Sequence, residues 1–137
     1  MKYFHLDILE LSETYRIDEN LVLSSTYKWY GHKDKTNNQG VGFIYNTNLP
    51  ITFTNIDNIL NDQRSRLILA QLEYLAIVEA YTPTGCSINE EKTKFFSTFL
   101  DIYQWALSQN LDLVVLGDFN GHIQSHFAND TILMDLN

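Results

Sequence analysis

The feature that most constrains the fold of this sequence is a helical segment between two apolar runs. The runs 75–81 (LAIVEAY) and 113–116 (LVVL) are short and apolar enough to be buried strands. Ser87 and Glu90 between them form a capping box, which predicts a helix over 88–109. The apolar stripe of that helix is Phe95, Phe96, Phe99, Tyr103, Ala106 and Leu107. A strand, a long helix and a strand make the crossover that parallel strands require.

Further strands are predicted at 7–12, 21–29, 41–45 and 66–72. These runs are short, are enriched in β-branched or aromatic residues, and several are separated by polar loops with Asn, Gly or Asp. No long helical pattern separates them, so we expect them to pair antiparallel. The predicted fold class is α/β, with mixed strands and one long helix.

Length and composition predict a single globular domain over 1–137. The chain is 45% apolar and has two Trp, eight Tyr and eight Phe residues, enough to fill a core. No run approaches the roughly 18 apolar residues of a membrane span, and acidic residues interrupt the N-terminal apolar segment, unlike a secretory signal. We expect an intracellular protein without membrane association, in nucleus or cytoplasm. Cys86 is the only cysteine, which excludes an intrachain disulfide and a cysteine-based zinc site.

The charge balance bears on nucleic-acid binding. A formal net charge of −8 opposes contact with a phosphate backbone unless the cations cluster or a divalent metal offsets the acids. Lys28, Lys33 and Lys35 lie in the stretch KWYGHKDK, and Arg64 and Arg66 form a second pair. Solvated loops and nucleic-acid contacts both explain these clusters, and the residues alone favour solvated loops.

Four polar residues follow or end predicted strands: Glu13, Tyr81, Asp118 and Asn120. Open α/β sheets bind ligands at the carboxyl ends of their strands, so these side chains are candidates for one site. Mg²⁺ prefers oxygen ligands and is usually held by one or two carboxylates plus substrate phosphate, for which Glu13 and Asp118 would suffice. Taken singly, each residue also fits a structural role as a turn former or a core aromatic.

The reaction that fits such a site is hydrolysis of a phosphodiester with Mg²⁺ or Mn²⁺. A metal polarises a phosphoryl oxygen and stabilises the departing alkoxide. Asp118 would orient or deprotonate the attacking water. The Tyr81 hydroxyl and the Asn120 amide would hold the pentacovalent phosphate.

Several sequence blocks resemble the endonuclease/exonuclease/phosphatase superfamily, above all the apurinic-type endonuclease domain of LINE-type (non-LTR) retrotransposon polyproteins. The blocks are LDILELSET, GHKDKTNNQGVGFIYNTNL, RLILAQLE, VEAYTPTGCSINEEKTKFFSTFLDIYQWA and LDLVVLGDFNGHI. Together they cover nearly the whole chain. The resemblance implies two sheets packed face to face between helices, and DNA as the substrate.

The resemblance also implies roles for individual residues. Glu13 matches the metal-binding glutamate of the family, and Tyr81 matches its active-site tyrosine beside the scissile phosphate. Asp118 and Asn120 match the aspartate and asparagine that act on the attacking water and the phosphate.

Two histidines near the end of the chain remain without a chemical step. His122 fits the retrotransposon pattern Gly-Asp-Phe-Asn-x-His. His126 lies four residues further on, but no helix signal and no H-E-x-x-H surround the pair, so a zinc site is not expected.

Parts of the family pattern are missing. Family members of this type are longer, opening with a strand that carries an asparagine near the metal and closing with strands that bear an aspartate and a Ser-Asp-His block. This sequence contains no Ser-Asp-His. The resemblance therefore implies a partial domain, weakened or inactive, with open sheet edges.

Three hypotheses remain open from the sequence. The first is a metal-dependent DNA endonuclease domain derived from a retroelement. The second is a non-catalytic remnant that binds a protein or itself through its open sheet edges. The third is a phosphatase acting on a small phosphorylated substrate, which the retrotransposon-like blocks disfavour.

Overall fold

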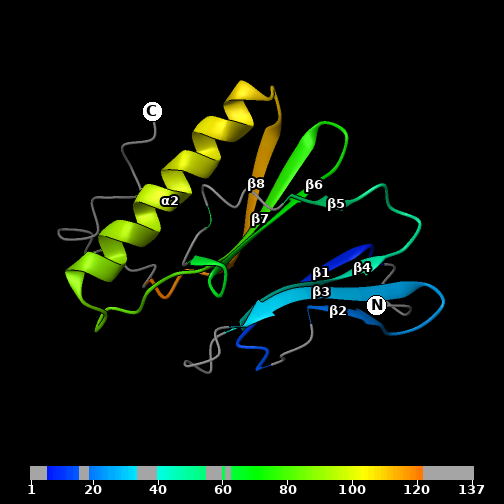
Figure 1. Ribbon diagram of the computed structural model, residues 1–137, viewed down its shortest axis with the longest axis horizontal. Helices are drawn as coiled ribbons and strands as arrows, with labels where there is room; N and C mark the ends of the chain where they lie inside the picture. Colours follow the sequence, from blue (N-terminus) through cyan, green and yellow to red (C-terminus); the bar gives the residue numbers. More distant parts are fainter. Residues whose placement is uncertain (1–5, 16–18, 34–39, 55–59, 61–62, 122–137) are drawn as a thin grey trace.

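The computed structural model describes residues 6–15, 19–33, 40–54, 60 and 63–121, which form three layers (Figure 1). Sheet A comprises β1 (Ile8–Ser12), β2 (Asn20–Val22), β3 (Tyr27–Lys33) and β4 (Gly40–Asn46), in the order β1-β4-β3-β2. Sheet B comprises β5 (Thr52–Phe53), β6 (Leu67–Gln71), β7 (Leu75–Tyr81) and β8 (Asp112–Asp118), in the order β5-β6-β7-β8. One face of sheet B packs on sheet A and the other on helix α2 (Asn89–Ser108). The predicted two-sheet α/β sandwich is confirmed.

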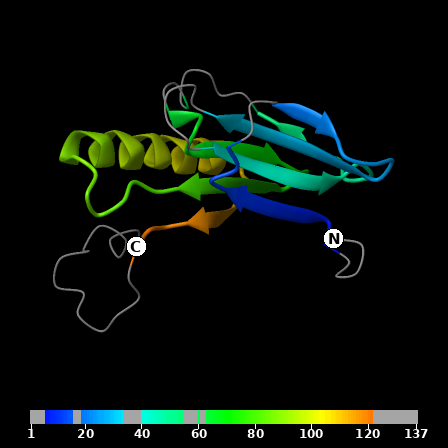
Figure 2. The same cartoon turned by 90° about the horizontal axis from the view of Figure 1, so that it is seen from below.

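The β7-α2-β8 segment is the predicted crossover. β7 and β8 run parallel, from Leu75 opposite Asp112 to Tyr81 opposite Asp118. The other strand pairs in both sheets are antiparallel, as expected. Figure 2 shows α2 along one side of sheet B and β8 beside β1, the edge strand of sheet A.

Helix α2 agrees with the predicted range to within one residue at each end, but the predicted capping box is wrong. The N-cap residue is Ile88, and no side chain makes a capping hydrogen bond. The Ser87 N–H donates to the Thr84 carbonyl at 3.0 Å, and the Ser87 hydroxyl lies 3.5 Å from that of Thr84, so Ser87 belongs to the preceding turn. At the other end Asn110 has a left-handed φ of 55°, a common way to terminate a helix.

The buried face of α2 differs from the predicted stripe in part. Phe95 and Ile102 are 1% and 0% exposed and pack with Val78 of β7, and Phe99 packs beside them. Leu107 is 59% exposed, because it follows the buried Ala106 by one position and therefore points away from sheet B. The buried positions that the stripe missed are Thr98 and Ile102. In the described part of the chain, no helix is both long and apolar enough to cross a membrane.

The predicted strand 21–29 is in fact a hairpin. The Ser24 side chain accepts the N–H groups of Thr26 and Tyr27, which turns the chain between β2 and β3. The interpretation of the lysine-rich stretch as a loop is wrong for Lys28, which lies in β3; Lys35 lies outside the described residues.

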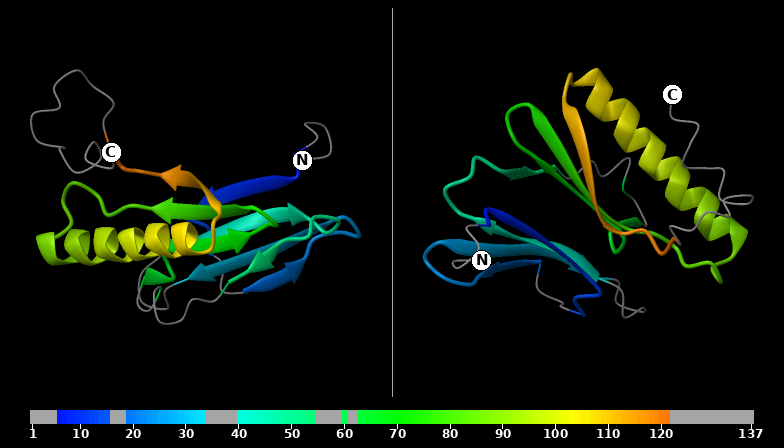
Figure 3. Two further views of the ribbon diagram at one scale, coloured as in Figure 1. Left: turned by 90° about the horizontal axis from the view of Figure 1, so that it is seen from above. Right: turned by 180° about the vertical axis from the view of Figure 1, so that it is seen from behind.

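The two sheets bury a shared apolar core. Along β7, alternate side chains face α2 and sheet A, so Ile77, Glu79 and Tyr81 all point between the sheets. Ile77 and Tyr81 pack with Phe43 of β4. The alternation therefore places a carboxyl group, Glu79, inside an otherwise apolar layer. Figure 3 shows the two sheets from above and from behind.

Candidate active site

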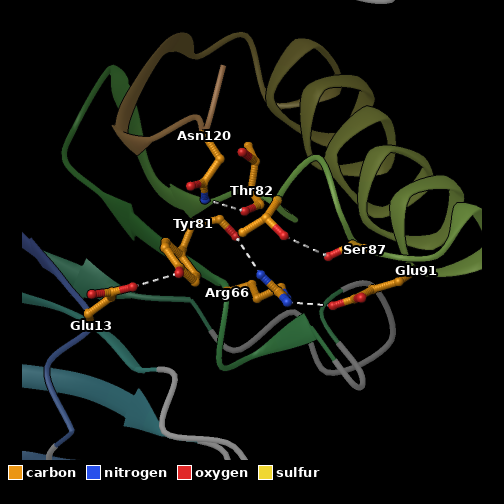
Figure 4. Close-up of polar contacts among 8 residues, drawn as sticks. Glu13, Arg66, Tyr81, Thr82, Ser87, Glu91 and Asn120 are labelled. Carbon is orange, nitrogen blue, oxygen red and sulfur yellow. Dashed lines mark hydrogen bonds and ion pairs between the residues drawn. The ribbon is translucent and has the colours of Figure 1, made fainter. Parts of the chain in front are cut away.

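The four residues predicted to form a site lie at strand ends. Glu13 follows β1, Tyr81 ends β7 and Asp118 ends β8, with Asn120 two residues later. Figure 4 shows Glu13, Tyr81 and Asn120. The register of the parallel pair places Tyr81 directly opposite Asp118. The site thus spans both sheets, with Glu13 contributed by sheet A and the other three by sheet B.

A hydrogen bond across the two sheets joins Glu13 and Tyr81. The Tyr81 hydroxyl donates to Oε1 of Glu13 at 2.7 Å, although the residues are 68 positions apart. Strict alternation would place Glu13 on the outer face of sheet A with Leu11, which lines a pocket against Trp29. Glu13 instead has a left-handed φ of 53°. This uncommon conformation redirects the chain so that the carboxylate reaches Tyr81.

The surroundings of Tyr81 favour its protonated form. The hydrogen bond to Glu13 raises the pKa of the phenol above its usual 10.0, and burial and the negative charge of Glu13 act in the same direction. The Asn120 side chain and, to a smaller extent, the positive charge of Arg66 oppose this shift. Tyr81 is therefore a neutral hydrogen-bond donor at pH 7.

The loop after β8 is fixed by close backbone contacts. Gly117 has a φ of +131°, and a Cβ there would lie 2.1 Å from the Ala80 carbonyl oxygen, so only glycine fits. The Asn120 N–H donates to Oδ1 of Asp118 at 2.8 Å, and its side-chain amide donates to the Thr82 carbonyl at 2.8 Å. Asp118 and Asn120 are therefore held at defined positions beside the end of β7.

The structure brings the two predicted metal ligands to the same end of the sandwich without a direct contact between them. Glu13 bonds to Tyr81, and Tyr81 pairs with Asp118 across β7 and β8. Among the described residues, no group of three or more Asp, Glu, His or Cys side chains is placed to hold a metal ion. Two exposed carboxylates fit Mg²⁺, whose remaining ligands are usually water and substrate phosphate. His122 and His126 lie outside the described residues.

Arg66 is part of this region, and the sequence interpretation missed it. Arg66 is 6% exposed, so the predicted solvated loop is wrong for this residue. Its guanidinium donates to the Tyr81 carbonyl at 3.3 Å, forms an ion pair with Glu91, and lies 5.4 Å from the centre of the Tyr81 ring. The signal in the sequence was its place at the start of the run RLILA, in phase with the inward-facing Ile68.

A buried acid lies one step deeper between the sheets. Glu79 is 0% exposed, and as a carboxylate neither of its oxygens has a hydrogen-bond partner among the described residues. Burial raises the pKa of Glu79 to about 11, and the negative charge of Glu10 acts in the same direction. Glu79 is therefore a neutral acid at pH 7, two residues before Tyr81 on the same face of β7.

Comparison with known proteins identifies the fold. No protein-family model matches this chain, and no curated protein matches it. Among solved structures it is similar to the 3'-5' exonuclease NExo from Neisseria meningitidis, with 20% identity and a TM-score of 0.61. A second structure, of the 3' phosphatase NExo from Neisseria bound to a product DNA hairpin, matches with 19% identity and a TM-score of 0.57.

These matches define the class of fold. Each covers 83% of this chain, and the two-sheet sandwich with its crossover helix is the endonuclease/exonuclease/phosphatase type of architecture. The chain spans 47% of the length of each of these neighbours. At this level of identity the likeness establishes the fold, and activity has to be argued from the site.

Proposed function

We propose that this chain is a metal-dependent phosphodiesterase domain acting on DNA, an endonuclease of the retrotransposon type. The observation that carries the proposal is the meeting of the Glu13–Tyr81 pair with Asp118 and Asn120 at one end of the sandwich. The sequence blocks that resemble retrotransposon endonucleases support it. The two neighbours are described as a 3'-5' exonuclease and as a 3' phosphatase bound to a product DNA hairpin, which supports the chemistry.

The proposed roles follow from the chemistry of each side chain. Glu13 and Asp118 would hold Mg²⁺ or Mn²⁺, which when bound polarises the phosphoryl oxygen and stabilises the leaving alkoxide. Asp118 also orients the attacking water through its second oxygen. The single O–H of Tyr81 donates to Glu13 in this structure; with Glu13 engaged on the metal it would donate to a phosphate oxygen instead, and the second N–H of the Asn120 amide would supply another donor.

The charge of the chain sets the conditions under which nicking is expected. A net charge of −8 lowers the rate of encounter with DNA, because the fields of protein and phosphate backbone repel. Added salt screens this repulsion but weakens the contacts that the few protein cations make with phosphate. We therefore expect slow nicking and measure it at low ionic strength, where contacts between the protein cations and phosphate are strongest.

The decisive experiment is an assay of supercoiled plasmid nicking at low salt with Mg²⁺ or Mn²⁺. The parent is compared with Asp118→Asn and with the matched control Asp101→Asn, an exposed aspartate of α2 whose replacement changes the charge by the same amount. Nicking should disappear in Asp118→Asn and persist in Asp101→Asn. Nicking that survives in Asp118→Asn would contradict the proposal.

Metal binding is measured separately by calorimetric titration. Two carboxylates without a closed cage hold Mg²⁺ loosely, so we expect a dissociation constant on the order of 1 mM or weaker. Glu13→Gln should reduce the heat of binding, and Glu73→Gln, an exposed glutamate in the turn between β6 and β7, should not. Equal heats in Glu13→Gln and the parent would remove Glu13 from the site.

A second candidate function, a self-associating module, is favoured by the edges of the sheets. Within the part of the chain that the structure describes, β1 and β8 each pair on one side only, and they lie next to each other. β8 is apolar on both faces, a pattern typical of strands that are covered on both sides. Its Val114 and Leu116 are nevertheless 39% and 38% exposed. Such edges favour strand addition. An obligate dimer by light scattering, unchanged by Mg²⁺ and without nicking, would support this function over the first.

A further inference from the structure

Arg66 is buried at the point where three elements meet. It stands immediately before β6, its main chain accepts the N–H of Tyr81 at 2.8 Å, and its side chain reaches Glu91 in the first turn of α2. Its side chain is 7% exposed, against 35% for that of Glu91. A charged side chain that is this buried costs stability unless its donors are paired, and here they are paired in two directions.

The contacts of Arg66 converge on Tyr81. One guanidinium nitrogen donates to the Tyr81 carbonyl at 3.3 Å, and the Cζ atom lies 5.4 Å from the centre of the Tyr81 ring, within cation–π range. The ring is thus held by the guanidinium on one side, while its hydroxyl is held by Glu13. The two contacts come from different sheets and together leave the phenol little freedom.

The fork of the guanidinium is necessary for this arrangement. A carbonyl and a carboxylate that diverge from one point can be bridged by a planar group with several N–H donors, whereas a lysine ammonium is a point charge on a flexible stem. The ion pair between Nη2 of Arg66 and Glu91 fixes one nitrogen of the guanidinium to α2. The other nitrogen, Nη1, is then held at a defined distance from the Tyr81 backbone and ring.

We propose that Arg66 is a positioning residue that fixes the Tyr81 hydroxyl for donation into the active site. The proposal rests on the proposed function, in which that hydroxyl acts on the phosphate. Its physical content, the placement of the Tyr81 ring and hydroxyl by Arg66, is measurable whether or not the chain turns over DNA.

The test uses the full chain labelled with 3-fluorotyrosine. The ¹⁹F resonance of Tyr81 is assigned by its loss in Tyr81→Phe and is followed through a pH titration. The variants are Arg66→Gln, Arg66→Lys and a control, Lys28→Gln, which removes one exposed positive charge from β3. Nicking of a labelled oligonucleotide is measured for the same set.

We expect Arg66→Gln to shift and broaden the Tyr81 resonance and to raise the pKa of the phenol further, because a nearby positive charge is lost. Arg66→Lys should retain more of the charge effect but still broaden the resonance. The kcat of Arg66→Gln should fall roughly 10- to 100-fold below that of Lys28→Gln, with KM unchanged between the two.

Each outcome decides one of the two claims. A Tyr81 resonance in Arg66→Gln that coincides with the parent throughout the titration overturns the positioning role. A shifted resonance together with a parent that never nicks DNA supports the positioning role and overturns the proposed function. If Arg66→Gln does not fold, Glu91→Gln frees the exposed end of the pair and should shift the same resonance by a smaller amount. An unchanged resonance in that variant then overturns the positioning role.

Discussion

Replacing Glu79 with glutamine tests whether the carboxyl group between the sheets is a neutral acid. Glu79 is 0% exposed, and its neighbours across the ladder of sheet B, Ile68 and Leu116, are apolar. From sheet A, Glu10 faces it, and the Gly42 main chain favours the charged form weakly. The Ser12 hydroxyl donates to Oε1 of Glu10 at 2.7 Å.

The sign and size of the effect follow from linkage. The pKa of Glu79 is about 11 in the folded chain against 4.5 for an unperturbed glutamate, so the folded state binds more protons than the unfolded state between these values. The contribution of Glu79 to stability is complete below pH 4.5 and is lost as the pH rises toward 11. The slope is about 1.4 kcal/mol per pH unit, or about 4 kcal/mol between roughly pH 6 and 9. The slope stays the same wherever the upper pKa lies, provided that it exceeds 9.

Urea denaturation of the parent and of Glu79→Gln at several pH values measures this slope. Glutamine does not titrate. As the pH rises, the free energy of unfolding of Glu79→Gln should therefore increase relative to that of the parent by about 1.4 kcal/mol for each pH unit. Glu73→Gln, which replaces an exposed acid, should follow the parent at all pH values. Parallel curves for Glu79→Gln and the parent would show that Glu79 is charged in the folded state and refute the reasoning. Glu10→Gln removes the facing charge and lowers the pKa of Glu79 in the folded chain, so the slope should end at a lower pH than in the parent.

Three further predictions concern packing and side-chain exposure. Gly117→Ala should destabilise the chain by about 3 kcal/mol or more in urea denaturation, because its φ is unfavourable for alanine and its Cβ would meet the Ala80 carbonyl at 2.1 Å. Phe95→Ala should cost about 3–5 kcal/mol by the same measurement, while Leu107→Ala on the exposed side of α2 should change stability by less than about 0.5 kcal/mol; equal losses would contradict the assignment of the buried face. Cys86 is exposed, so one equivalent of a thiol reagent should react without denaturant; protection of the thiol would contradict its placement.

The parts of the fold that the sequence predicts well are those with local causes. The strand 75–81 and the helix have apolar spacing that needs no distant partner to be recognised, and both agree with the structure to within one residue. The sequence predicts one strand where the structure has the hairpin between β2 and β3, because Ser24 and its neighbours are compatible with either conformation. The turn depends on backbone N–H groups that meet the Ser24 oxygen. β5, with only two residues, has no pattern of its own and exists through pairing with β6.

The helix start illustrates a competition that sequence spacing does not resolve. Ser87 and Glu90 have the spacing of a capping box, and the same Ser87 can also close a turn with Thr84. In the structure Ser87 forms the turn, and Ile88 is the N-cap residue without a side-chain hydrogen bond. The helix still begins where expected because its length is set by burial of Phe95 and Ile102 against sheet B.

At the site, the sequence identifies residues by their positions at strand ends, but their chemical states depend on distant partners. Tyr81 closes an apolar run, a local fact, yet its role as a donor depends on Glu13, 68 residues away, and its ring position on Arg66, 15 residues away. Glu79 has apolar neighbours on both faces of β7, so alternation alone could not tell which sheet it would face or that Glu10 would oppose it. Because burial and pairing determine whether a carboxyl or phenol carries its proton, the protonation states at this end of the sandwich follow from the packing of sheet A on sheet B.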